Sequence, residues 1–548
     1  MEQIGNTLRG SYYDPQIGIL GYGVYLPIER ISTAEVVKDR EGKKADQQYL
    51  DKIRYGLRLR NKSIAGPTED SISIGTEAAE NAIKMAGIDP KELGYVGVGS
   101  ESKVYAVGQT ARHIATFVGS GHHVSTLDAE AACNPGMQQM DLADSQIRAG
   151  KARYALVVGT DVSQAPRGDP LEYAAGAGAA AYVLGRDDPL AVMPNRPAHY
   201  SSLLLDFWRR DGQPVPKHFG KTTVKAYQDH VLGAIAKYLA ENPDVRLSEI
   251  DHITYHQPSG YMPKKVGEAL TKSPIKIFYD PELEKQINTT NIGDRMKLTE
   301  DEVKTKFKLW GEEWGNTYAA STLMNIAGIL DTAVPDDDVL AVSYGSGAYS
   351  TATHFKVKDA IEGKRGRTPT VEDYVNRKRE IDIPTFNSRI ARQDHEKLSQ
   401  LPRLVAEINN LEPLTKDEVS LSVCKDNGNV CRIYAPARSE CLDPNCTGQL
   451  QTITLPKEAT VKDWRKVSRR ERLHAMASSG KHKNLLGEIY LGHEIPLVDY
   501  SERELRAGLP HRAVIRRLYD EGADGYRIYG WTMRPESERF PITEIKSF

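Results

Sequence analysis

Cys133 is the residue of this chain whose type and position most directly suggest chemistry. It stands in the run AEAACNPGM at residues 129–137 and is the only cysteine before residue 420. Small residues precede it, and Met137, Met140 and Ile147 follow with helical spacing, so we expect the thiol at a helix start. Free backbone N–H groups there stabilise a thiolate, the nucleophilic form of cysteine. The alternative is a thiol that merely packs in the core, because free cysteine is among the most buried residue types.

Three polar residues lie where predicted strands or helices end, and each has a structural as well as a chemical interpretation. His256 follows an apolar strand in YHQPSGYMP, Asn316 precedes a helix in GNTYAAST, and Glu101 follows a strand in GSESKVYAVGQT. A histidine can be hydrogen-bonded in the core, an asparagine can cap its helix, and a carboxylate can simply be solvated. Together with Cys133, they are what a thiolase-like condensing enzyme requires.

The elements that must position these residues alternate between apolar strands and amphipathic helices. In the first half we expect strands in 17–27, 93–102 and 154–162, and a helix over 70–87 that Asp70 caps and Gly87 ends. From about residue 220 a similar plan runs again. It comprises a helix in 227–242, a strand and loop in 250–258, a helix in 318–334 and a closing strand pair in 338–357.

This alternation predicts an α/β fold in which strands pack between helix layers. We expect two similar halves, about 15–190 and 220–357, in a domain spanning 1–357, with no short repeat of the solenoid kind. Residues 358–415 turn polar and charged and are interpreted as a C-terminal extension and linker. Residues 416–548 then begin a separate small domain of short β-strands and turns.

Composition excludes several classes of function. Lys and Arg total 72 against 74 for Asp and Glu, a net charge of -2, which provides no general attraction to nucleic acid or anionic lipid. No apolar stretch reaches membrane-spanning length and the first residues are polar, so we expect a cytoplasmic protein without a membrane partner. Small molecules or proteins are the expected partners.

Eight stretches together resemble the hydroxymethylglutaryl-CoA synthase family, especially its archaeal form, in order and spacing over residues 1 to about 395. They are IGILGYGVYLP, VGSESKVYAVGQTARHIA, AACNPGM, LEYAAGAGAAAYVLG, DFWRRDGQPVPKH, YHQPSGYMPKK, NTYAASTLMNIAGILD and SYGSGAYS. The resemblance implies a thiolase-like fold of duplicated αβαβα layers. It also implies condensation of acetyl-CoA with acetoacetyl-CoA to 3-hydroxy-3-methylglutaryl-CoA, a reaction of the mevalonate pathway that leads to isoprenoids.

The resemblance also assigns roles to matching positions. Cys133 would carry the acetyl group as a thioester, Glu101 would remove a proton from its methyl group, and His256 would hydrogen-bond or protonate the acceptor ketone. Asn316 would orient the acceptor, and the backbone near Cys133 and Ser346 would donate to the oxyanions. The substrate-binding positions that the resemblance implies are Asn316, Tyr344, Gly345 and Ser346. Lys264 and its neighbour Lys265 carry charges suited to the phosphates of coenzyme A, with a solvated surface pair as the alternative.

Other members of the superfamily fit less well. A decarboxylating ketoacyl synthase needs no base such as Glu101, and a thiolase would bring a second cysteine from its second half, where SYGSGAYS has none. Two stretches depart from the synthase pattern, at residues 134–136 (Asn-Pro-Gly) and in TTVKAYQDH, and both lie where the substrate is expected to approach. A condensing enzyme with another acyl donor or acceptor therefore stays an alternative, as does a non-catalytic scaffold that recruits a partner thiolase.

The other cysteines, Cys424, Cys431, Cys441 and Cys446, fall in the C-terminal domain and invite a structural zinc site, since four thiolates close a tetrahedron. Their spacing of six, nine and four intervening residues is looser than paired C-x-x-C knuckles, so unliganded thiols are the alternative. The context resembles the small zinc-ribbon and OB-fold proteins that accompany archaeal thiolases, here fused to the synthase-like part. By analogy we expect a homodimer or larger assembly, and a thiolase is a candidate partner.

Overall fold

The computed structural model of the 548-residue chain describes most of residues 16–394 and six strands beyond them. The described segments are 16–66, 68–162, 165–204, 206–210, 213, 215–394, 419–426, 429–434, 449–455, 458–460, 510–520 and 527–535. No helix in these segments is long and apolar enough to cross a membrane. The fold below is that of these residues.

A mixed sheet runs through the body of the molecule, and its first half is built around β1. Its strands, in spatial order, are β1 (Gly18–Tyr25), β7 (Ala177–Gly185), β6 (Tyr154–Val162), β4 (Leu93–Gly99) and β5 (Ser125–Ala129). β1 and β6 both pair antiparallel with β7, whereas β6, β4 and β5 run parallel to one another. β1, β6 and β7 are buried throughout, which explains why they appear in the sequence as continuous apolar runs.

The second half repeats the same order of pairings. β12 (His252–Tyr255) is parallel to β13 (Asp338–Gly345), which pairs antiparallel with β14 (Tyr349–Val357), and β14 pairs antiparallel with β9 (Ala198–Ser201). The first half has the same sequence of one parallel and two antiparallel pairings from β4 through β6 and β7 to β1. A short strand, β8 (Ala191–Val192), pairs with both β1 and β14 and joins the halves into one ten-stranded sheet.

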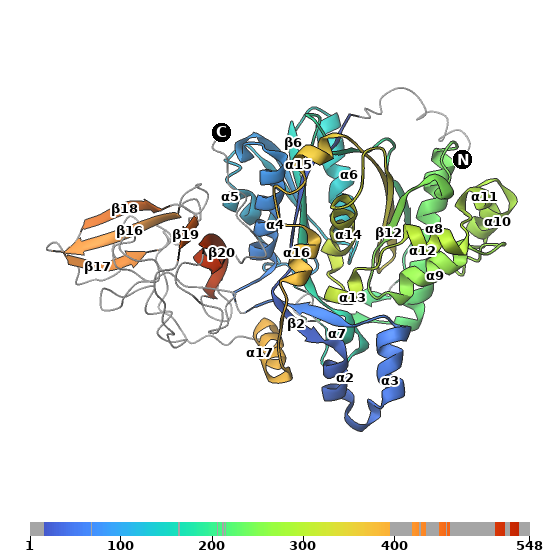
Figure 1. The fold of residues 1–548 in the computed structure, drawn as a ribbon, viewed down its shortest axis with the longest axis horizontal. Coiled ribbons are helices and arrows are strands. Elements are labelled where there is room, and N and C mark those ends of the chain that lie inside the picture. Colours follow the sequence, from blue (N-terminus) through green and yellow to red (C-terminus); the bar gives the residue numbers. More distant parts are fainter. Residues whose placement is uncertain are drawn as a thin grey trace.

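Helices cover the two outer faces of the strand layers and fill the space between them (Figure 1). On one outer side lie α4 (Ser71–Ala86) and α5 (Thr110–Phe117), and on the other lie α8 (Gly220–Glu241) and α9 (Tyr261–Leu270). Between the halves lie α6 (Pro135–Arg148) and α14 (Ser321–Leu330), which contact each other. The layered α/β architecture expected from the sequence is therefore present.

The layers explain the local sequence. Every residue of α14 is buried because the helix has packed neighbours on all sides, as an apolar helix without a polar face requires. Asp70 caps α4 through its side chain, which accepts the backbone N–H of Ser73, and Gly87 ends that helix with a φ of 72°. The predicted cap and stop of this helix are confirmed.

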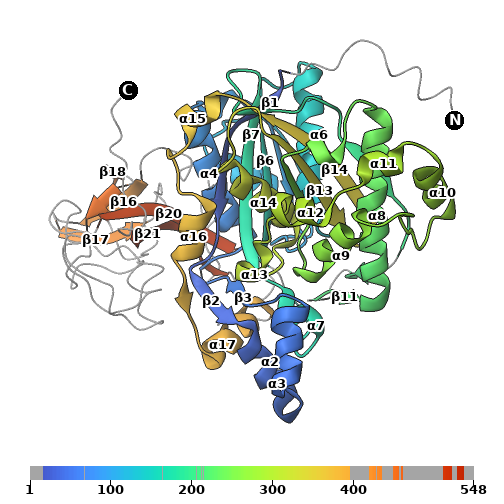
Figure 2. The same cartoon turned by 45° about the vertical axis from the view of Figure 1, so that its right-hand side comes forward.

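A small lobe hangs below the layers in the view of Figure 2 and packs its own apolar core. It contains β2 (Glu29–Ser32), α2 (Thr33–Glu41), α3 (Gln47–Asp51), β3 (Asn61–Ile64), α7 (Pro170–Ala174), β15 (Arg379–Glu380) and α17 (Ile383–Asp394). β15 pairs with β2, and Phe386 of α17 is fully buried in the core of this lobe. The polar segment after Lys358 therefore forms packed elements as far as α17, including α15 (Ala360–Lys364) and α16 (Val371–Asn376).

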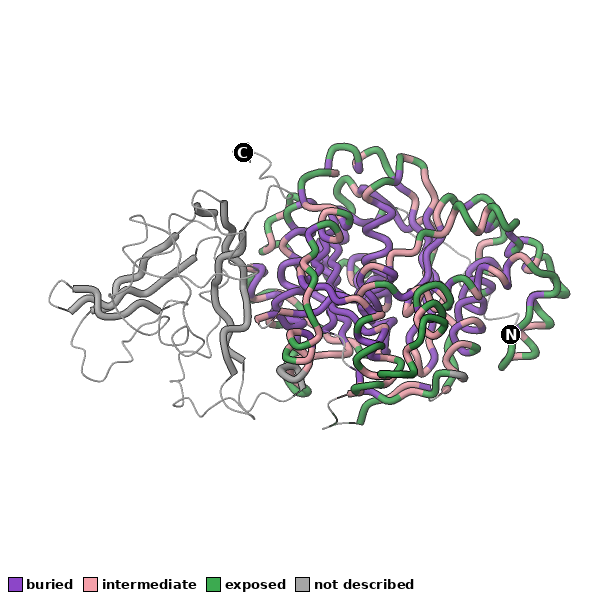
Figure 3. The backbone as a smooth tube through the Cα atoms, turned by 60° about the horizontal axis from the view of Figure 1, so that its bottom comes forward, coloured by how far each residue is buried: buried purple, intermediate pink, exposed green. Residues whose placement is uncertain are grey.

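Figure 3 shows the buried backbone concentrated in the central layers, with exposed residues on the outer helices and loops. The outer elements include β10 (Phe207–Trp208), β11 (Lys217–His218), α10 (Pro281–Thr289), α11 (Ile292–Met296), α12 (Glu300–Lys306) and α13 (Gly311–Trp314). Beyond residue 418 the described strands form two antiparallel sheets of three strands. They are β17 (Asn429–Tyr434), β16 (Val419–Asp426) and β18 (Gln449–Leu455), and β19 (Glu458–Thr460), β20 (Pro510–Asp520) and β21 (Arg527–Pro535).

Candidate active site

Cys133 lies in the turn between β5 and α6, one residue before the N-cap of α6. Ala132 has a φ of 48°, a left-handed conformation that costs a non-glycine residue about 1–2 kcal/mol and turns the chain sharply before the thiol. The next residue, Asn134, is fully buried; its Nδ2 donates to Thr351 Oγ1 over 3.2 Å and its Oδ1 accepts the Ser343 hydroxyl. The departure from the synthase pattern at Asn134 therefore ties the cysteine loop to β13 and β14.

Glu101 lies just beyond the end of β4, and its carboxylate reaches the same loop. The backbone N–H of Ala132 lies near enough to lower the pKa of the carboxylate, whose Oε1 is buried without a hydrogen-bond partner. Burial, with smaller contributions from the charges of Asp161 and Glu130, raises the pKa of Glu101 to about 8. At neutral pH the carboxyl group is therefore mostly protonated, and its ionised form, which grows toward pH 8, is a stronger base than an ordinary carboxylate.

Asp161, at the end of β6, holds the Glu101 segment in place. Its Oδ1 accepts the backbone N–H groups of Glu101 and Ser102, each over 2.8 Å, and also the Ser102 and Ser100 hydroxyls. Its Oδ2 accepts the backbone N–H of Ala319 over 2.9 Å, just ahead of α14. One buried carboxylate thus joins the end of β4 to the start of α14.

Asn316 faces the cysteine. Its Nδ2 points to Cys133 Sγ at 3.9 Å, and its Oδ1 accepts the backbone N–H of Tyr318 over 2.9 Å. The N-cap of α14 is Ala320, so Asn316 is not the helix cap that was one of its two interpretations. Burial, followed by the charges of Glu101 and Asp161, raises the pKa of the Cys133 thiol well above its usual value, and the Asn316 amide opposes this rise. The expected thiolate at a helix start is therefore not the resting form, because burial outweighs the helix end.

His256 directly follows β12 and is almost fully buried. Its backbone N–H donates to the Val342 carbonyl oxygen over 2.9 Å and its carbonyl oxygen accepts the Tyr227 hydroxyl over 2.6 Å. The next residue, Gln257, donates its backbone N–H to Ser321 Oγ over 3.3 Å, which places this strand end at the start of α14. Nδ1 has no hydrogen-bond partner, and burial lowers the pKa of His256 to about 3, so the ring is neutral near neutral pH.

The segment of Tyr344, Gly345 and Ser346 at the end of β13 packs against the cysteine loop. A Cβ atom at Gly345 would clash with the carbonyl oxygen of Ala131, so only glycine permits this approach. Asp206, fully buried, accepts the backbone N–H of Gly347 over 2.7 Å and the Tyr344 hydroxyl over 3.4 Å. The predicted site residues at Cys133, Glu101, Asn316 and this segment therefore lie together, and His256 lies at the α14 end that Asp161 also contacts.

Lys264 lies on the surface near the start of α9, where its ammonium faces Glu268 Oε1 at 3.8 Å. Of the candidate zinc ligands, Cys424 and Cys431 lie on the paired strands β16 and β17, whereas Cys441 and Cys446 lie outside the described residues. Among the described residues no group of three or more potential ligand side chains could hold a metal ion. The predicted zinc site therefore stays a prediction.

Asp161 and Asp206 were not singled out by sequence reasoning. Asp161 belongs to the apolar strand YALVVGTDV and Asp206 opens the motif DFWRRDG. The signal available for Asp161 was a carboxylate at the end of an otherwise apolar buried strand, where a charge needs partners. For Asp206 the sequence carries no comparable signal, because its partner Gly347 is far along the chain.

Comparisons with known proteins bear on the family and the fold of the chain. The thiolase N-terminal domain family matches residues 67–184. The chain is 38% identical to the hydroxymethylglutaryl-CoA synthase of Methanopyrus kandleri over 361 residues, covering 66% of this chain and 93% of that protein. It is also 38% identical to the hydroxymethylglutaryl-CoA synthase of Archaeoglobus fulgidus over 371 residues, covering 68% of this chain and 97% of that protein.

Among solved structures, the fold resembles a crystal structure of HMG-CoA synthase complexed with CoA. The TM-score is 0.58 at 19% identity, over 71% of this chain and 95% of that chain. At this identity the likeness shows the fold alone, and it confirms the predicted thiolase-like α/β architecture. Roughly a third of this chain lies outside the matches to the two archaeal relatives, which cover 66% and 68% of it.

Proposed function

The chain belongs to the hydroxymethylglutaryl-CoA synthase family, and we propose that Cys133, Glu101 and His256 carry out its condensation of acetyl-CoA with acetoacetyl-CoA. The observation that carries this proposal is the closeness of the Glu101 carboxylate to the cysteine loop: the Ala132 N–H lowers the pKa of Glu101, and the charge of Glu101 raises the pKa of the Cys133 thiol. This supports a base with a raised pKa acting beside the nucleophile.

In the first step the Cys133 sulfur attacks the thioester carbon of acetyl-CoA. A bond forms between Sγ and the acetyl carbon, the bond to the sulfur of coenzyme A breaks, and the thiol proton leaves with the departing thiolate. Because the pKa of the Cys133 thiol is raised, its proton must leave the sulfur as the bond to the acetyl carbon forms, and it ends on the sulfur of coenzyme A. The backbone around Cys133 and Ser346 is proposed to meet the oxyanion, because the N–H groups of Asn134 and Met137 at the start of α6 are already hydrogen-bonded and Pro135 has none.

In the second step the Glu101 carboxylate takes a proton from the methyl group of acetyl-Cys133. The resulting carbanion forms a carbon–carbon bond with the ketone carbon of acetoacetyl-CoA. His256, neutral above about pH 3, stabilises the developing alkoxide by donating a hydrogen bond rather than as a cation. The proton held by Glu101 is then available to the alkoxide, so the base is regenerated within the same turnover.

In the last step water attacks the acetyl-derived thioester carbon. The bond to Cys133 breaks, the thiol recovers its proton, and 3-hydroxy-3-methylglutaryl-CoA is released with a free carboxylate. Asn316, with Tyr344, Gly345 and Ser346, is proposed to orient the acceptor, since all four lie against the cysteine loop. Lys264 is proposed to meet the phosphates of coenzyme A at the surface, on charge alone.

The experiment that tests this function is stepwise. Incubation with acetyl-CoA should add one acetyl group, and intact and peptide mass spectrometry should place it on Cys133. Acetoacetyl-CoA added next should discharge the adduct as 3-hydroxy-3-methylglutaryl-CoA. No adduct contradicts the nucleophile, and an adduct that acetoacetyl-CoA leaves unchanged contradicts the acceptor.

The C-terminal part is proposed, from its resemblance alone, to be a fused zinc-ribbon and OB-fold domain that helps hold coenzyme A or a partner thiolase. Cys424 and Cys431 occupy neighbouring positions on β16 and β17, because Cys424 is paired with Arg432. Zinc content of the full chain, compared with Cys441→Ser, tests the metal. Equal zinc in both proteins, or none in either, contradicts a four-cysteine site. A homodimer, the mevalonate pathway and the cytoplasm stay predictions.

A further inference from the structure

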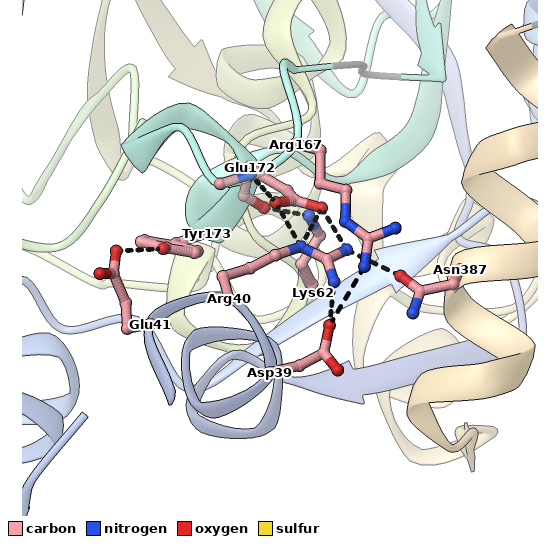
Figure 4. Close-up of polar contacts among 9 residues, drawn as sticks. Asp39, Arg40, Glu41, Lys62, Arg167, Glu172, Tyr173 and Asn387 are labelled. Carbon is pink, nitrogen blue, oxygen red and sulfur yellow. Dashed lines mark hydrogen bonds and ion pairs between the residues drawn. The ribbon is translucent and has the colours of Figure 1, made fainter. Parts of the chain in front are cut away.

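A buried cluster of charges lies beside the active site, in the small lobe (Figure 4). Arg40 of α2 grips Glu172 of α7 with two nitrogens: Nε lies 2.9 Å from Oε2 and Nη2 lies 2.7 Å from Oε1. The two side chains are only 4% and 3% exposed. Such a two-pronged pair fixes both position and orientation, which a single contact does not.

Two further contacts fix α7 on other sides. The ammonium of Lys62, on β3, donates to the backbone carbonyl oxygen of Glu172, and Glu172 Oε2 accepts the backbone N–H of Gly168 over 2.7 Å. Lys62 is itself buried, and burial lowers its pKa to about 8. Because this buried ammonium donates to a main-chain carbonyl oxygen and not to a carboxylate, its contact fixes the position of the α7 backbone more than it neutralises a charge.

The C-terminal end of α7 is hydrogen-bonded to the backbone of Asn316. The carbonyl oxygen of Ala174 accepts the backbone N–H of Asn316 over 2.7 Å, and the Asn316 carbonyl oxygen accepts the backbone N–H of Gly176 over 2.8 Å. Ala175, between them, packs in one cluster with Cys133. The backbone of Asn316 is therefore clamped from both sides by the segment that Glu172 anchors.

We propose that Glu172, held by Arg40 and Lys62, is a positioning residue that sets the Asn316 amide against the Cys133 sulfur by fixing α7. The inference deepens the proposed function and rests on it only in taking Cys133 as the nucleophile. Glu172 reaches Cys133 through another residue and is not itself catalytic. Its contribution is to keep the Nδ2 of Asn316 within reach of the sulfur.

A purely structural role for this cluster explains its geometry less well. Buried ion pairs give little net stability, since desolvation of both charges offsets their attraction. Here the contacts of Arg40 and Lys62 converge on α7, a helix of only five residues, and the Glu172 carboxylate also holds Gly168 just before it. The cluster also extends to α17, because Arg40 Nη2 donates to Asn387 Oδ1 over 2.8 Å and Phe386 lies under both cations.

The test compares Glu172→Gln with the matched control Glu29→Gln. Glu29 is equally buried and pairs with Arg389 of α17 over 2.8 Å, so its loss also breaks a buried pair at α17. The readout is the rate at which iodoacetamide alkylates Cys133, followed by peptide mass spectrometry from neutral to alkaline pH. This rate reports thiolate formation whatever acyl donor the enzyme uses.

In Glu172→Gln the pH profile of alkylation should shift to higher pH, because the thiolate loses a hydrogen bond from Asn316. Alkylation at neutral pH should slow roughly three- to tenfold, the effect of one lost hydrogen bond to the sulfur. Glu29→Gln should leave the profile unchanged. A folded Glu172→Gln protein with the wild-type profile, or an equal shift in both variants, overturns the proposal. If Glu172→Gln does not fold, Arg40→Lys, which keeps the charge but loses the two-pronged grip, should give the same direction of shift, and an unshifted profile overturns it.

The same proteins separate this proposal from the proposed function. If wild-type protein fails to form the acetyl adduct or the condensation product, the assigned reaction is wrong. The alkylation profiles still decide whether Glu172 positions Asn316. If the reaction proceeds but Glu172→Gln has the wild-type alkylation profile, the proposed function stands and the positioning role of Glu172 is wrong.

Discussion

The carboxylate of Glu101 lies close to Cys133: its charge raises the pKa of that thiol, and the backbone N–H of Ala132, the residue before Cys133, lowers the pKa of Glu101. The two segments are far apart in sequence and come from β4 and β5, which run parallel and end at the same edge. Because the two parallel strands end at the same edge of the sheet, they bring a carboxylate and a thiol together in a fixed relative orientation.

Replacing Glu101 with Gln should separate the two chemical steps. The amide keeps the size of the side chain but cannot take the methyl proton, so condensation should fall by about 10²- to 10⁴-fold while acetylation of Cys133 persists. Intact mass measures the adduct, and product assay measures condensation. The control is Glu130→Gln, whose carboxylate is largely exposed and paired with Lys103, and condensation should survive in it. Condensation at the wild-type rate in Glu101→Gln removes the assigned base.

Condensation should rise with pH and level off above about pH 8. The pKa of Glu101 is raised to about 8, and only the ionised carboxylate accepts a proton, so the active fraction increases through that value. His256 stays neutral down to about pH 3 and adds no opposing limb in this range. Single-turnover measurement from preformed acetyl-enzyme isolates this step, and a midpoint near the ordinary value for a carboxyl group would contradict the buried base.

Glu101→Gln should also stabilise the fold at neutral pH. In the unfolded chain this carboxyl ionises at its ordinary pKa, whereas in the fold it stays protonated up to about pH 8. Between those values the folded state binds more protons, so the free energy of unfolding falls as pH rises. Removing the group should recover about 1–3 kcal/mol at neutral pH. Urea unfolding at several pH values checks both the gain and the flatter slope.

Much of the layer plan could be predicted from the sequence, because buried strands and amphipathic helices leave periodic apolar patterns. The cap at Asp70, the stop at Gly87 and the strand pair that contains Tyr344 are of this kind. Cys133 could be predicted for a different reason, because it is the only cysteine before residue 420 and stands where a helix is expected to start.

The partners of these residues could not be predicted, because they depend on contacts between distant segments. Asp161 joins β4 to α14, and Arg40 reaches Glu172 across 132 positions, without any local pattern that requires it. The same holds for the pKa of Cys133, which burial and two carboxylates determine more strongly than the helix start does. The sequence predicts an extension and linker over 358–415 and does not reveal helices α15 to α17, because their apolar residues, such as Phe386, pack against distant segments.

Gly345→Ala should damage the site through shape alone. The new methyl group would collide with the Ala131 carbonyl oxygen and push the cysteine loop away, so we expect a loss of more than about 2 kcal/mol or a strong fall in acetylation. Gly363→Ala is the control, because its Cβ would meet nothing within 4 Å. Thermal unfolding and the acetyl-adduct rate measure the two effects. Wild-type values for Gly345→Ala would show that β13 does not pack on the loop as described.

Asp161→Asn tests whether one buried carboxylate both holds and tunes the base. An amide offers a single acceptor oxygen, so one side of the junction between Glu101 and Ala319 loses its hydrogen bond, at a cost of about 1–3 kcal/mol. The loss of negative charge should also lower the pKa of Glu101, so the pH midpoint of condensation should move below about 8. The matched control is Asp144→Asn, a buried carboxylate that pairs with Arg148 within α6.

Both variants should lose stability, but only Asp161→Asn should shift the pH midpoint, because only its carboxylate lies close enough to Glu101 to raise that pKa. Urea unfolding and single-turnover condensation on the same samples separate the two effects. An unshifted midpoint in a destabilised Asp161→Asn protein would leave Asp161 with a holding role only. The raised pKa of Glu101 would then depend on burial and the charge of Glu130.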